Sequence, residues 1–207
     1  TAAFGLPILN NLDSSSQSVQ AIVLCPTREL CLQIAKELES FSANMKGVRI
    51  QAVYGGADIS KQIKGLKDNP QIVVGTPGRI RDLVKENALL VHTAPVLVVD
   101  EADLAFDMGF IEDIDGFASH MPEKLEMFVF SATIPEKLQP FLKKYMDAPV
   151  HIHMNDKRPV AENIEFYLVP VRSKSRNTRL LEVINSINPY LAVIFCNTRK
   201  NAEAVAT

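Results

Sequence analysis

Short apolar runs alternate along this chain with segments in which apolar residues recur every three to four positions. The runs predict β-strands over residues 19–25, 49–54, 71–75, 96–100, 126–131 and 150–153. The periodic segments predict helices over residues 1–12, 28–42, 59–66, 78–86, 110–120 and 135–145. Strict alternation of this kind is typical of an α/β protein, in which a parallel sheet carries helices on both faces.

The alternation breaks at residues 154–163 and then restarts. The second stretch predicts a strand over residues 164–171, a helix over 175–187, a strand over 190–196 and a helix over 198–206. Two strands and two helices cannot close a core of their own. We therefore expect a first domain over residues 1–154, and a linker with the start of an incomplete second α/β domain over residues 155–207.

Composition excludes several classes of protein. The chain is 47% hydrophobic and 22% charged, as in an ordinary globular protein. Its net charge is −2, so the overall charge does not indicate a nucleic acid partner. The apolar runs are too short to cross a membrane, and the start of the chain resembles no signal peptide. Three scattered cysteines fit a reducing, cytoplasmic location and no zinc site. The absence of an initiator Met suggests that the chain belongs to something longer.

Two adjacent carboxylates follow one of the predicted buried strands. Asp100 and Glu101 come directly after the apolar run that ends at Val99. Ligands sit at the carboxyl ends of parallel strands, and Mg²⁺ needs only one or two carboxylates besides phosphate oxygens. A second carboxylate can act as a general base. The pair alone indicates a nucleotide phosphatase, although an acidic helix N-terminus without chemistry is an equally ordinary explanation.

Four further short elements also stand at junctions between a predicted strand and a helix. They are Pro26-Thr27-Arg28-Glu29-Leu30, Gly55-Gly56, Thr76-Pro77-Gly78-Arg79 and Ser131-Ala132-Thr133. Capped helix starts with an arginine suit phosphate groups, but each is equally explained as a cap or a turn. Ser131 and Thr133 could bond a carboxylate such as Asp103 or cap the next helix. All would gather at one edge of one sheet.

The ordered set of motifs resembles the first RecA-like domain of a DEAD-box RNA helicase. The set is PTREL (26–30), GG (55–56), TPGR (76–79), DEAD (100–103) and SAT (131–133), and residues 106–110 continue the resemblance. Residues 194–198 resemble the family's motif IV, near the start of its second domain. The resemblance covers essentially the whole chain. It implies a RecA-like P-loop NTPase fold and an RNA-dependent ATPase that separates or remodels RNA, with ATP and Mg²⁺ as cofactors and no membrane.

The resemblance also implies a role for each motif residue. Asp100 would hold Mg²⁺ through water and Glu101 would deprotonate the attacking water, whereas Asp103, Ser131 and Thr133 would couple the nucleotide site to RNA. Contacts to single-stranded or duplex RNA would come from Pro26, Thr27, Arg28, Gly55, Gly56, Thr76, Pro77, Gly78 and Arg79. Such backbone contacts carry no sequence information. Phe195, Asn197 and Thr198 would be the motif IV residues.

Departures from the family pattern qualify this expectation. Thr1 resembles the threonine that ends the family's phosphate loop and would ligate Mg²⁺, but the preceding glycines and lysine are absent from these 207 residues. The upstream glutamine motif and motifs V and VI are absent as well. We expect this polypeptide, as a monomer, to hydrolyse ATP negligibly although its parent protein would be active. A non-catalytic RNA-binding or adaptor fragment is the alternative, and an unrelated ATPase would leave PTREL and TPGR unexplained.

Overall fold

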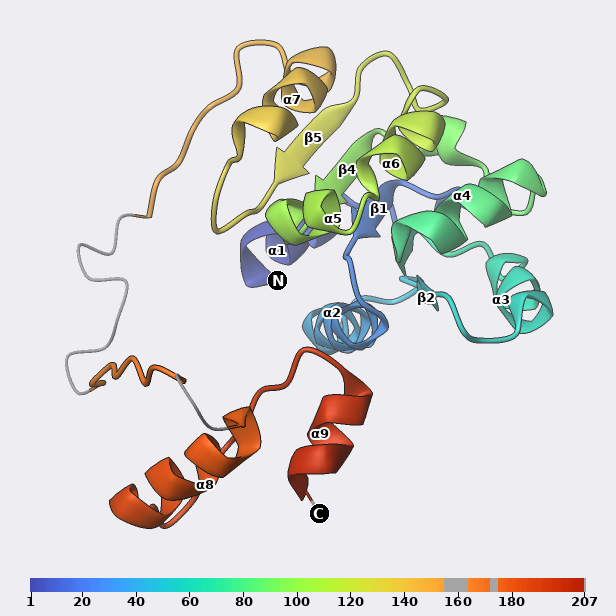
Figure 1. Ribbon diagram of the computed structural model, residues 1–207. Coiled ribbons are helices and arrows are strands. Elements are labelled where there is room, and N and C mark those ends of the chain that lie inside the picture. The colour runs from blue at the N-terminus through green and yellow to red at the C-terminus, as the bar shows by residue number, and fades with distance from the viewer. Residues whose placement is uncertain (155–163, 172–174, 207) are drawn as a thin grey trace. The chain divides into compact units, whose positions relative to one another are not determined.

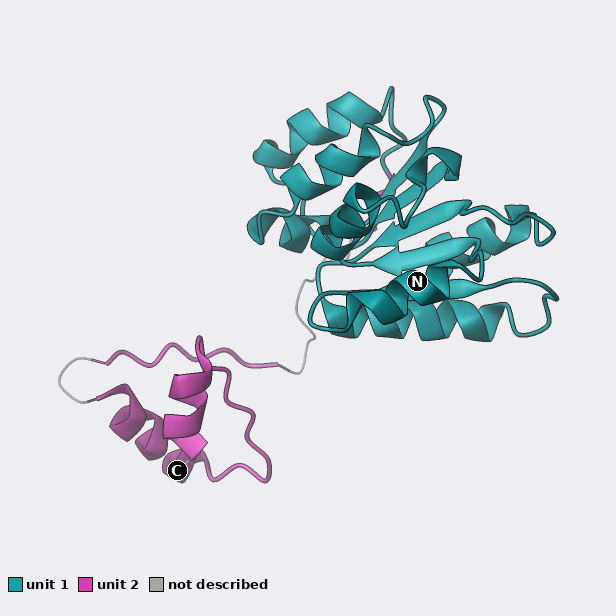
Figure 2. Cartoon of the chain, turned by 90° about the vertical axis from the view of Figure 1, so that its right-hand side faces the viewer, with its two compact units in different colours: residues 1–151 teal, residues 152–207 magenta. Residues whose placement is uncertain are grey.

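In the computed structural model, residues 1–154, 164–171 and 175–206 are described. The chain forms two compact units, Thr1–His151 and Ile152–Thr207, which are coloured separately in Figure 2. The first contains all the strands of the described residues, and the second contains two helices, α8 (Arg176–Ile187) and α9 (Arg199–Ala206).

The first unit is built on a five-stranded sheet that is parallel throughout (Figure 1). The strands are β1 (Ala21–Leu24), β2 (Ile50–Val53), β3 (Ile72–Gly75), β4 (Val96–Val99) and β5 (Glu126–Val129). Their order is β2-β3-β1-β4-β5. Every carboxyl end therefore lies at the same edge of the sheet, as the alternation of runs and periodic segments predicts.

Helices cover both faces of this sheet. They are α1 (Ala2–Asn11), α2 (Arg28–Phe41), α3 (Ile59–Leu66), α4 (Pro77–Lys85), α5 (Ala102–Asp107), α6 (Ile111–Ala118) and α7 (Gln139–Tyr145). Short 3₁₀ turns, η1 (Val91–Thr93) and η2 (Glu136–Leu138), complete the set. The predicted fold class, an α/β protein with a parallel sheet and helices on both faces, is confirmed.

Two separate apolar cores hold the layers together, because alternate strand residues point to opposite faces. On β1, Ala21 and Val23 join α1 and α2 in one core, which includes Phe4 and Leu38. Ile22 and Leu24 belong to the other core, with side chains of α3, α4, α6 and α7. All four β1 residues are buried, so this strand is central and carries an unbroken apolar run.

Some sequence predictions of local structure were wrong. Residues 150–153, 164–171 and 190–196 form no strand, and their apolar side chains are exposed, as Leu168 and Phe195 illustrate at 97% and 94%. A strand is stable only when a neighbour satisfies its backbone groups, and in the described part of the second unit no sheet offers one. An apolar run cannot reveal whether such a neighbour exists.

Two helix predictions also need correction. The helix predicted for residues 135–145 begins only at Gln139, because Pro135 precedes a 3₁₀ turn, η2. Helix α5, which follows Glu101, was not predicted as a separate helix. With only 6 residues it is too short to show a clear apolar period.

Candidate functional site

The five predicted motifs lie at the carboxyl edge of the sheet, each beginning within two residues of the end of a different strand. Contacts between them divide the motifs into two groups. The first, here called the acidic pocket, joins the loop after β4 to the loop after β5. The second, here called the loop cluster, joins residues 26–28 after β1, 54–57 after β2 and 76–79 after β3.

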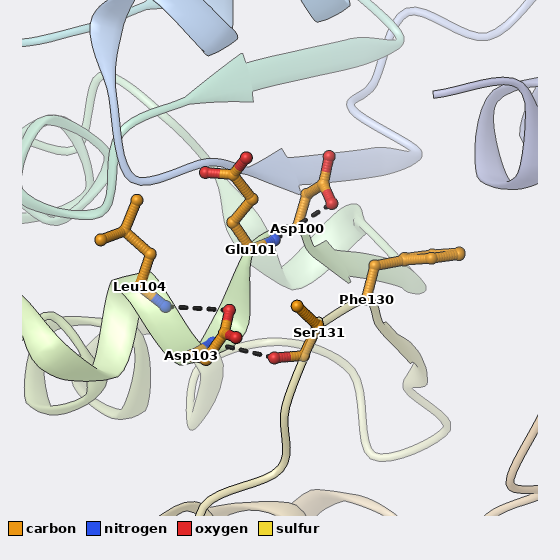
Figure 3. A pocket seen from close by; sticks show the side chains of 7 residues that line it. Asp100, Glu101, Asp103, Leu104, Phe130 and Ser131 are labelled. Atoms are coloured by element: carbon orange, nitrogen blue, oxygen red, sulfur yellow. Dashed lines mark hydrogen bonds between the residues drawn. The ribbon is translucent and has the colours of Figure 1, made fainter. Parts of the chain in front are cut away.

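The acidic pocket is a cavity of about 320 Å³ (Figure 3). Its lining residues are Asp100, Glu101, Asp103, Leu104, Phe130, Ser131 and Ala132. Backbone hydrogen bonds fix its two walls, since Ala102 N donates to Phe130 O at 3.0 Å and Phe130 N donates to Val99 O at 2.8 Å. The pocket therefore sits on the continuation of the β4–β5 pairing, which positions its carboxylates firmly.

Asp100 is the first residue beyond β4 and is half-buried. Its backbone N–H still bonds to Leu24 O at 2.9 Å, so the sheet holds its Cα in place. Burial raises the pKa of this carboxyl, while the hydrogen bond that it accepts from Glu101 N (3.0 Å) and the positive Thr1 amino group lower it. Burial wins, so the ionised form of Asp100 lacks full compensation from the protein itself.

Glu101 has a left-handed backbone, with φ of 50° and ψ of 51°. A residue with a Cβ adopts this conformation at a cost of roughly 1–2 kcal/mol. Such strain persists where the surrounding structure imposes it, and it is concentrated at functional sites. Here the sharp turn ends β4, begins α5 and leaves the Glu101 side chain exposed at the pocket.

Asp103 is bound to the loop after β5. Its Oδ2 accepts from Thr133 N at 3.0 Å and from Thr133 Oγ1 at 2.9 Å, and its own N–H donates to Ser131 Oγ at 3.0 Å. Ser131 in turn donates to Thr133 O. Burial alone would raise the pKa of Asp103, but these hydrogen bonds and one from Leu104 N outweigh it and lower the pKa. Of the two possibilities, a hydroxyl bond to the Asp103 carboxylate is confirmed for Thr133, whereas Ser131 Oγ bonds the backbone N–H of Asp103.

Figure 3 shows how the three acidic residues divide between two tasks. The backbone N–H of Asp103 bonds Ser131 Oγ and its carboxylate accepts from Leu104 N, whereas the carboxylates of Asp100 and Glu101 lie apart from these contacts. The carboxylate of Asp103 is thus already hydrogen-bonded within the protein. Asp100 and Glu101 are the carboxylates that remain available at the cavity.

The loop cluster begins at the start of α2. Thr27 caps this helix, as predicted, with its Oγ1 accepting from Leu30 N at 3.2 Å. Pro26 before it is buried, and Arg28 after it is exposed. The Arg28 guanidinium lies over the ring of Tyr54 with its carbon 4.9 Å from the ring centre, within the range of a cation–π contact. Arg28 is therefore held by the residue that precedes Gly55.

Gly55 and Gly56 present bare backbone to solvent. A Cβ at either position would meet nothing within 4 Å, and Gly56 has a positive φ of 77° that favours glycine. Gly55 N donates to Thr76 Oγ1 at 3.4 Å, so Thr76 uses its hydroxyl for the neighbouring loop. Thr76 occupies the N-cap position of α4, as predicted, but its side chain makes no capping hydrogen bond, and Pro77 lies in the first turn of the helix.

Arg79 is half-buried and turns back to the protein, while Gly78 beside it is half-buried as well. Arg79 Nη1 donates to Gln62 Oε1 at 2.8 Å, and Arg79 Nη2 donates to Ala57 O at 3.0 Å. The motifs did not identify Gln62 as a site residue, although the apolar pattern of α3 contains a signal for it. Residues 59, 62, 63 and 66 follow helical spacing, so a glutamine stands on the apolar face of α3, where it must find partners.

The remaining predicted residues lie outside these two groups. Thr1 is not among the residues that line the acidic pocket, and its hydroxyl is hydrogen-bonded to Glu37. In the second unit, Phe195 and Asn197 are exposed, and Thr198 Oγ1 accepts from Asn201 N at 3.2 Å at the start of α9.

The donors at the acidic pocket fit a hydrated magnesium ion. Within the described residues, no group of three or more His, Cys, Asp or Glu side chains could hold a metal alone. Mg²⁺ usually keeps several waters and takes one or two carboxylates together with phosphate oxygens. Asp100, a half-buried carboxylate without full compensation, and Glu101 beside it match that requirement.

A parallel α/β sheet with acidic residues on the loop after a central strand and glycine-containing loops beside it is the arrangement of a RecA-like domain. Residues 1–141 match the family described as DEAD/DEAH box helicase. The chain belongs to this family.

Similar proteins agree with the assignment. The chain is 50% identical to the DEAD-box ATP-dependent RNA helicase CshB of Bacillus cereus and 47% identical to CshB of Bacillus subtilis, in each case over 100% of this chain and 48% of the relative. The chain thus spans about half the length of the curated relatives that it matches. A crystal structure of a DEAD box protein from Methanococcus jannaschii aligns with a TM-score of 0.71 and 34% identity, over 99% of this chain and 54% of that one.

None of the helices in the described residues is long and apolar enough to cross a membrane.

Proposed function

We propose that this chain is the nucleotide- and RNA-binding part of an ATP-dependent RNA helicase, which couples ATP binding and hydrolysis to RNA strand separation or remodelling. The observation that carries the proposal is the shared edge: an acidic pocket and an arginine-bearing loop cluster occur at the carboxyl ends of adjoining strands. The names of the similar proteins, ATP-dependent RNA helicases, support the same function.

In this proposal the acidic pocket receives the phosphate groups of ATP. Asp100 would hold Mg²⁺ through water, Glu101 would orient and deprotonate the attacking water, and Thr1, whose hydroxyl bonds Glu37 here, would contribute a hydroxyl ligand. The raised pKa of Asp100 supports the assignment, because a cation would supply the missing compensation. When bound, Mg²⁺ neutralises charge on the phosphate oxygens during phosphoryl transfer.

Asp103, Ser131 and Thr133 form the proposed coupling element. Their hydrogen bonds join the loop after β4, which carries Asp100 and Glu101, to the loop after β5. A movement of one loop would therefore displace the other. This property supports a role in transmitting the nucleotide state to the RNA site.

The loop cluster is the proposed RNA-binding surface. Its members are Pro26, Thr27, Arg28, Gly55, Gly56, Thr76, Pro77, Gly78 and Arg79. Open space beside both glycines lets a sugar-phosphate backbone approach closely, and the arginines supply donors for phosphate. Recognition of this kind is independent of base sequence and weakens with salt.

Residues 155–207 are proposed to begin the second RecA-like domain, with residues 1–154 as the first. Phe195, Asn197 and Thr198 would then be motif IV residues of that domain. We also propose that the protein acts as a monomer in the cytoplasm. The three cysteines, Cys25, Cys31 and Cys196, are all free, which fits a reducing compartment. Light scattering and cell fractionation test these two statements.

Two measurements test the proposed function. Fluorescence anisotropy with labelled single-stranded RNA should give a dissociation constant that rises with salt, by a log–log slope of about 0.7 for each phosphate contacted. ATP hydrolysis by the protein that carries these residues should rise when RNA is added. Salt-independent binding, or hydrolysis indifferent to RNA, would contradict the proposal.

A further inference from the structure

Gln62 is a buried polar residue beside the loop cluster that belongs to none of the five motifs. It is 6% exposed and lies on the inner face of α3. Only three polar residues of the described chain are buried to this degree, namely Ser42, Gln62 and Gln71. A buried amide is tolerated when its hydrogen-bonding groups are satisfied, so the partners of Gln62 reveal what it holds.

The Gln62 amide satisfies the backbone at the point where β2 ends. Its Oε1 accepts from Tyr54 N at 3.3 Å, and its Nε2 donates to Tyr54 O at 3.1 Å. Tyr54 is the first residue after β2, and its ring carries the Arg28 guanidinium. Gln62 thereby holds the residue on which Arg28 rests.

The same oxygen of Gln62 also accepts from Arg79 Nη1 at 2.8 Å. Arg79 then reaches the far side of the loop, where its Nη2 donates to Ala57 O at 3.0 Å. With the bond from Gly55 N to Thr76 Oγ1, the loop of residues 54–57 is held to α3 and α4 at several points. In contrast, the space beside Gly55 and Gly56 is open. The loop is therefore held on the side that faces α3 and α4, and it is accessible at its two glycines.

We propose that Gln62 is a positioning residue for RNA binding, which fixes the loop of residues 54–57 and orients both Arg28 and Arg79. The inference rests on the proposed function of the loop cluster. A fork of donors already fixed by the protein loses less conformational entropy when it meets a phosphate. Gln62 itself touches no RNA; it acts through Tyr54 and Arg79.

The first test is hydrogen–deuterium exchange of the 207-residue chain without RNA. Gln62→Met keeps the length of the side chain and removes all its hydrogen bonds. Exchange of the amides in residues 54–57 should accelerate about five- to tenfold, the effect of losing roughly one hydrogen bond's net stabilisation. Unchanged exchange in these residues overturns the inference, whether or not the chain binds RNA.

The second test measures RNA affinity in a double-mutant cycle with Gln62→Met, Arg79→Met and the combination. Gln62→Met alone should weaken binding about fivefold and leave the salt slope unchanged, because the phosphate contacts re-form once RNA is bound. The loss in the double variant should be smaller than the two single losses combined, because the part of the Gln62 effect that acts through Arg79 is absent while the part that acts through Tyr54 and Arg28 remains. Additive losses, or no loss from Gln62→Met, would overturn the inference.

Gln71→Met is the matched control for loss of a buried glutamine. Gln71 also bonds the backbone of separate loops, through Arg49 N at 2.8 Å and Ser16 O at 2.8 Å, but it precedes β3 at the opposite edge of the sheet. Its variant should lower stability without changing RNA affinity or exchange in residues 54–57. If Gln71→Met does not fold, Gln51→Met replaces it; Gln51 is half-buried and its amide donates to Ala52 O at 2.9 Å.

The outcomes separate this inference from the proposed function. If the unaltered chain binds no RNA, the proposed RNA surface is wrong, while the exchange experiment still decides whether Gln62 fixes the loop. If the unaltered chain binds RNA and Gln62→Met binds equally well, the RNA surface stands and the positioning role of Gln62 is wrong.

Discussion

The acidic pocket and the loop cluster lie on one edge of the same sheet but differ in how the protein compensates their charges. Burial raises the pKa of Asp100, and its contacts with the protein do not bring the pKa back to its ordinary value. In the loop cluster, Arg28 rests on Tyr54 and Arg79 bonds Gln62 and Ala57. In the acidic pocket, the negative charge of Asp100 needs a ligand to compensate it. In the loop cluster, the protein itself already orients the positive charges of Arg28 and Arg79. The following predictions test this difference, in order of decreasing effect.

Replacement of the proposed general base should have the largest effect. In the longer parent protein, Glu101→Gln keeps the size of the side chain and removes its ability to accept a proton, so RNA-stimulated ATP hydrolysis should fall about 10²–10⁴-fold. RNA affinity at the loop cluster should stay the same, which anisotropy can measure on the same preparation. Glu112→Gln on the exposed side of α6 is the control. A loss of less than tenfold would exclude Glu101 from proton transfer.

The contact between Arg28 and Tyr54 should have an intermediate effect on RNA alone. Tyr54→Leu removes the aromatic face and should weaken RNA binding roughly two- to fivefold, as expected for an exposed cation–π contact. Tyr54→Phe retains the face and should bind as the unaltered chain does. Equal losses for both variants would show that the hydroxyl, rather than the ring, matters.

Removal of the Thr133 hydroxyl should have a smaller, pH-dependent effect on stability. Asp103 has a lowered pKa in the folded chain, so its contribution is present above the ordinary pKa of an aspartate and is lost as pH falls through the lower, folded value. Thr133→Val should therefore lower the free energy of unfolding by about 0.5–1 kcal/mol at neutral pH, and by less in acid.

Urea unfolding at neutral pH and at about pH 3 measures this difference. Thr93→Val is the matched control, because Thr93 Oγ1 donates to the neutral carbonyls of Val19 and Leu90 at 3.0 and 3.1 Å. The decrease in the free energy of unfolding caused by Thr93→Val should not vary with pH. If Thr133→Val behaves like Thr93→Val, the hydroxyl does not act through the charge of Asp103.

The smallest expected effect is a gain in stability. Because burial raises the pKa of Asp100, the folded state retains its proton more readily than the unfolded state, and stability falls as pH rises through that raised value. Asp100→Asn removes this penalty and should raise the Tm of the ligand-free chain at neutral pH by about 1–2 °C.

Mg²⁺ with nucleotide should reverse the order of Tm for this pair, because a ligand that binds only the unaltered folded chain stabilises it. The exposed Asp68→Asn is the control. If Asp100→Asn melts below the unaltered chain without ligand, Asp100 is compensated within the protein and the contrast between the two sites is wrong.

The sequence anticipated the sheet well and the second unit poorly. The run that forms β1 is apolar at every position, and a strand buried on both faces needs only that pattern. Residues 190–196 are likewise apolar at every position, yet they form no strand, because pairing depends on a neighbour that a local pattern cannot reveal. Their positions after predicted strands placed Asp100 and Arg28 at the carboxyl edge of the sheet.

Sequence by itself determined which chemical groups end each strand, since covalent adjacency fixes Asp100 after β4 and Thr27 after β1. Only the tertiary structure decided which of these groups meet. Thr133 binds Asp103 from 30 residues away, and Gln62 binds Arg79 from 17 residues away. Hydrogen bonds require distances of about 3 Å, and only packing of the helices against the sheet brings such distant residues that close.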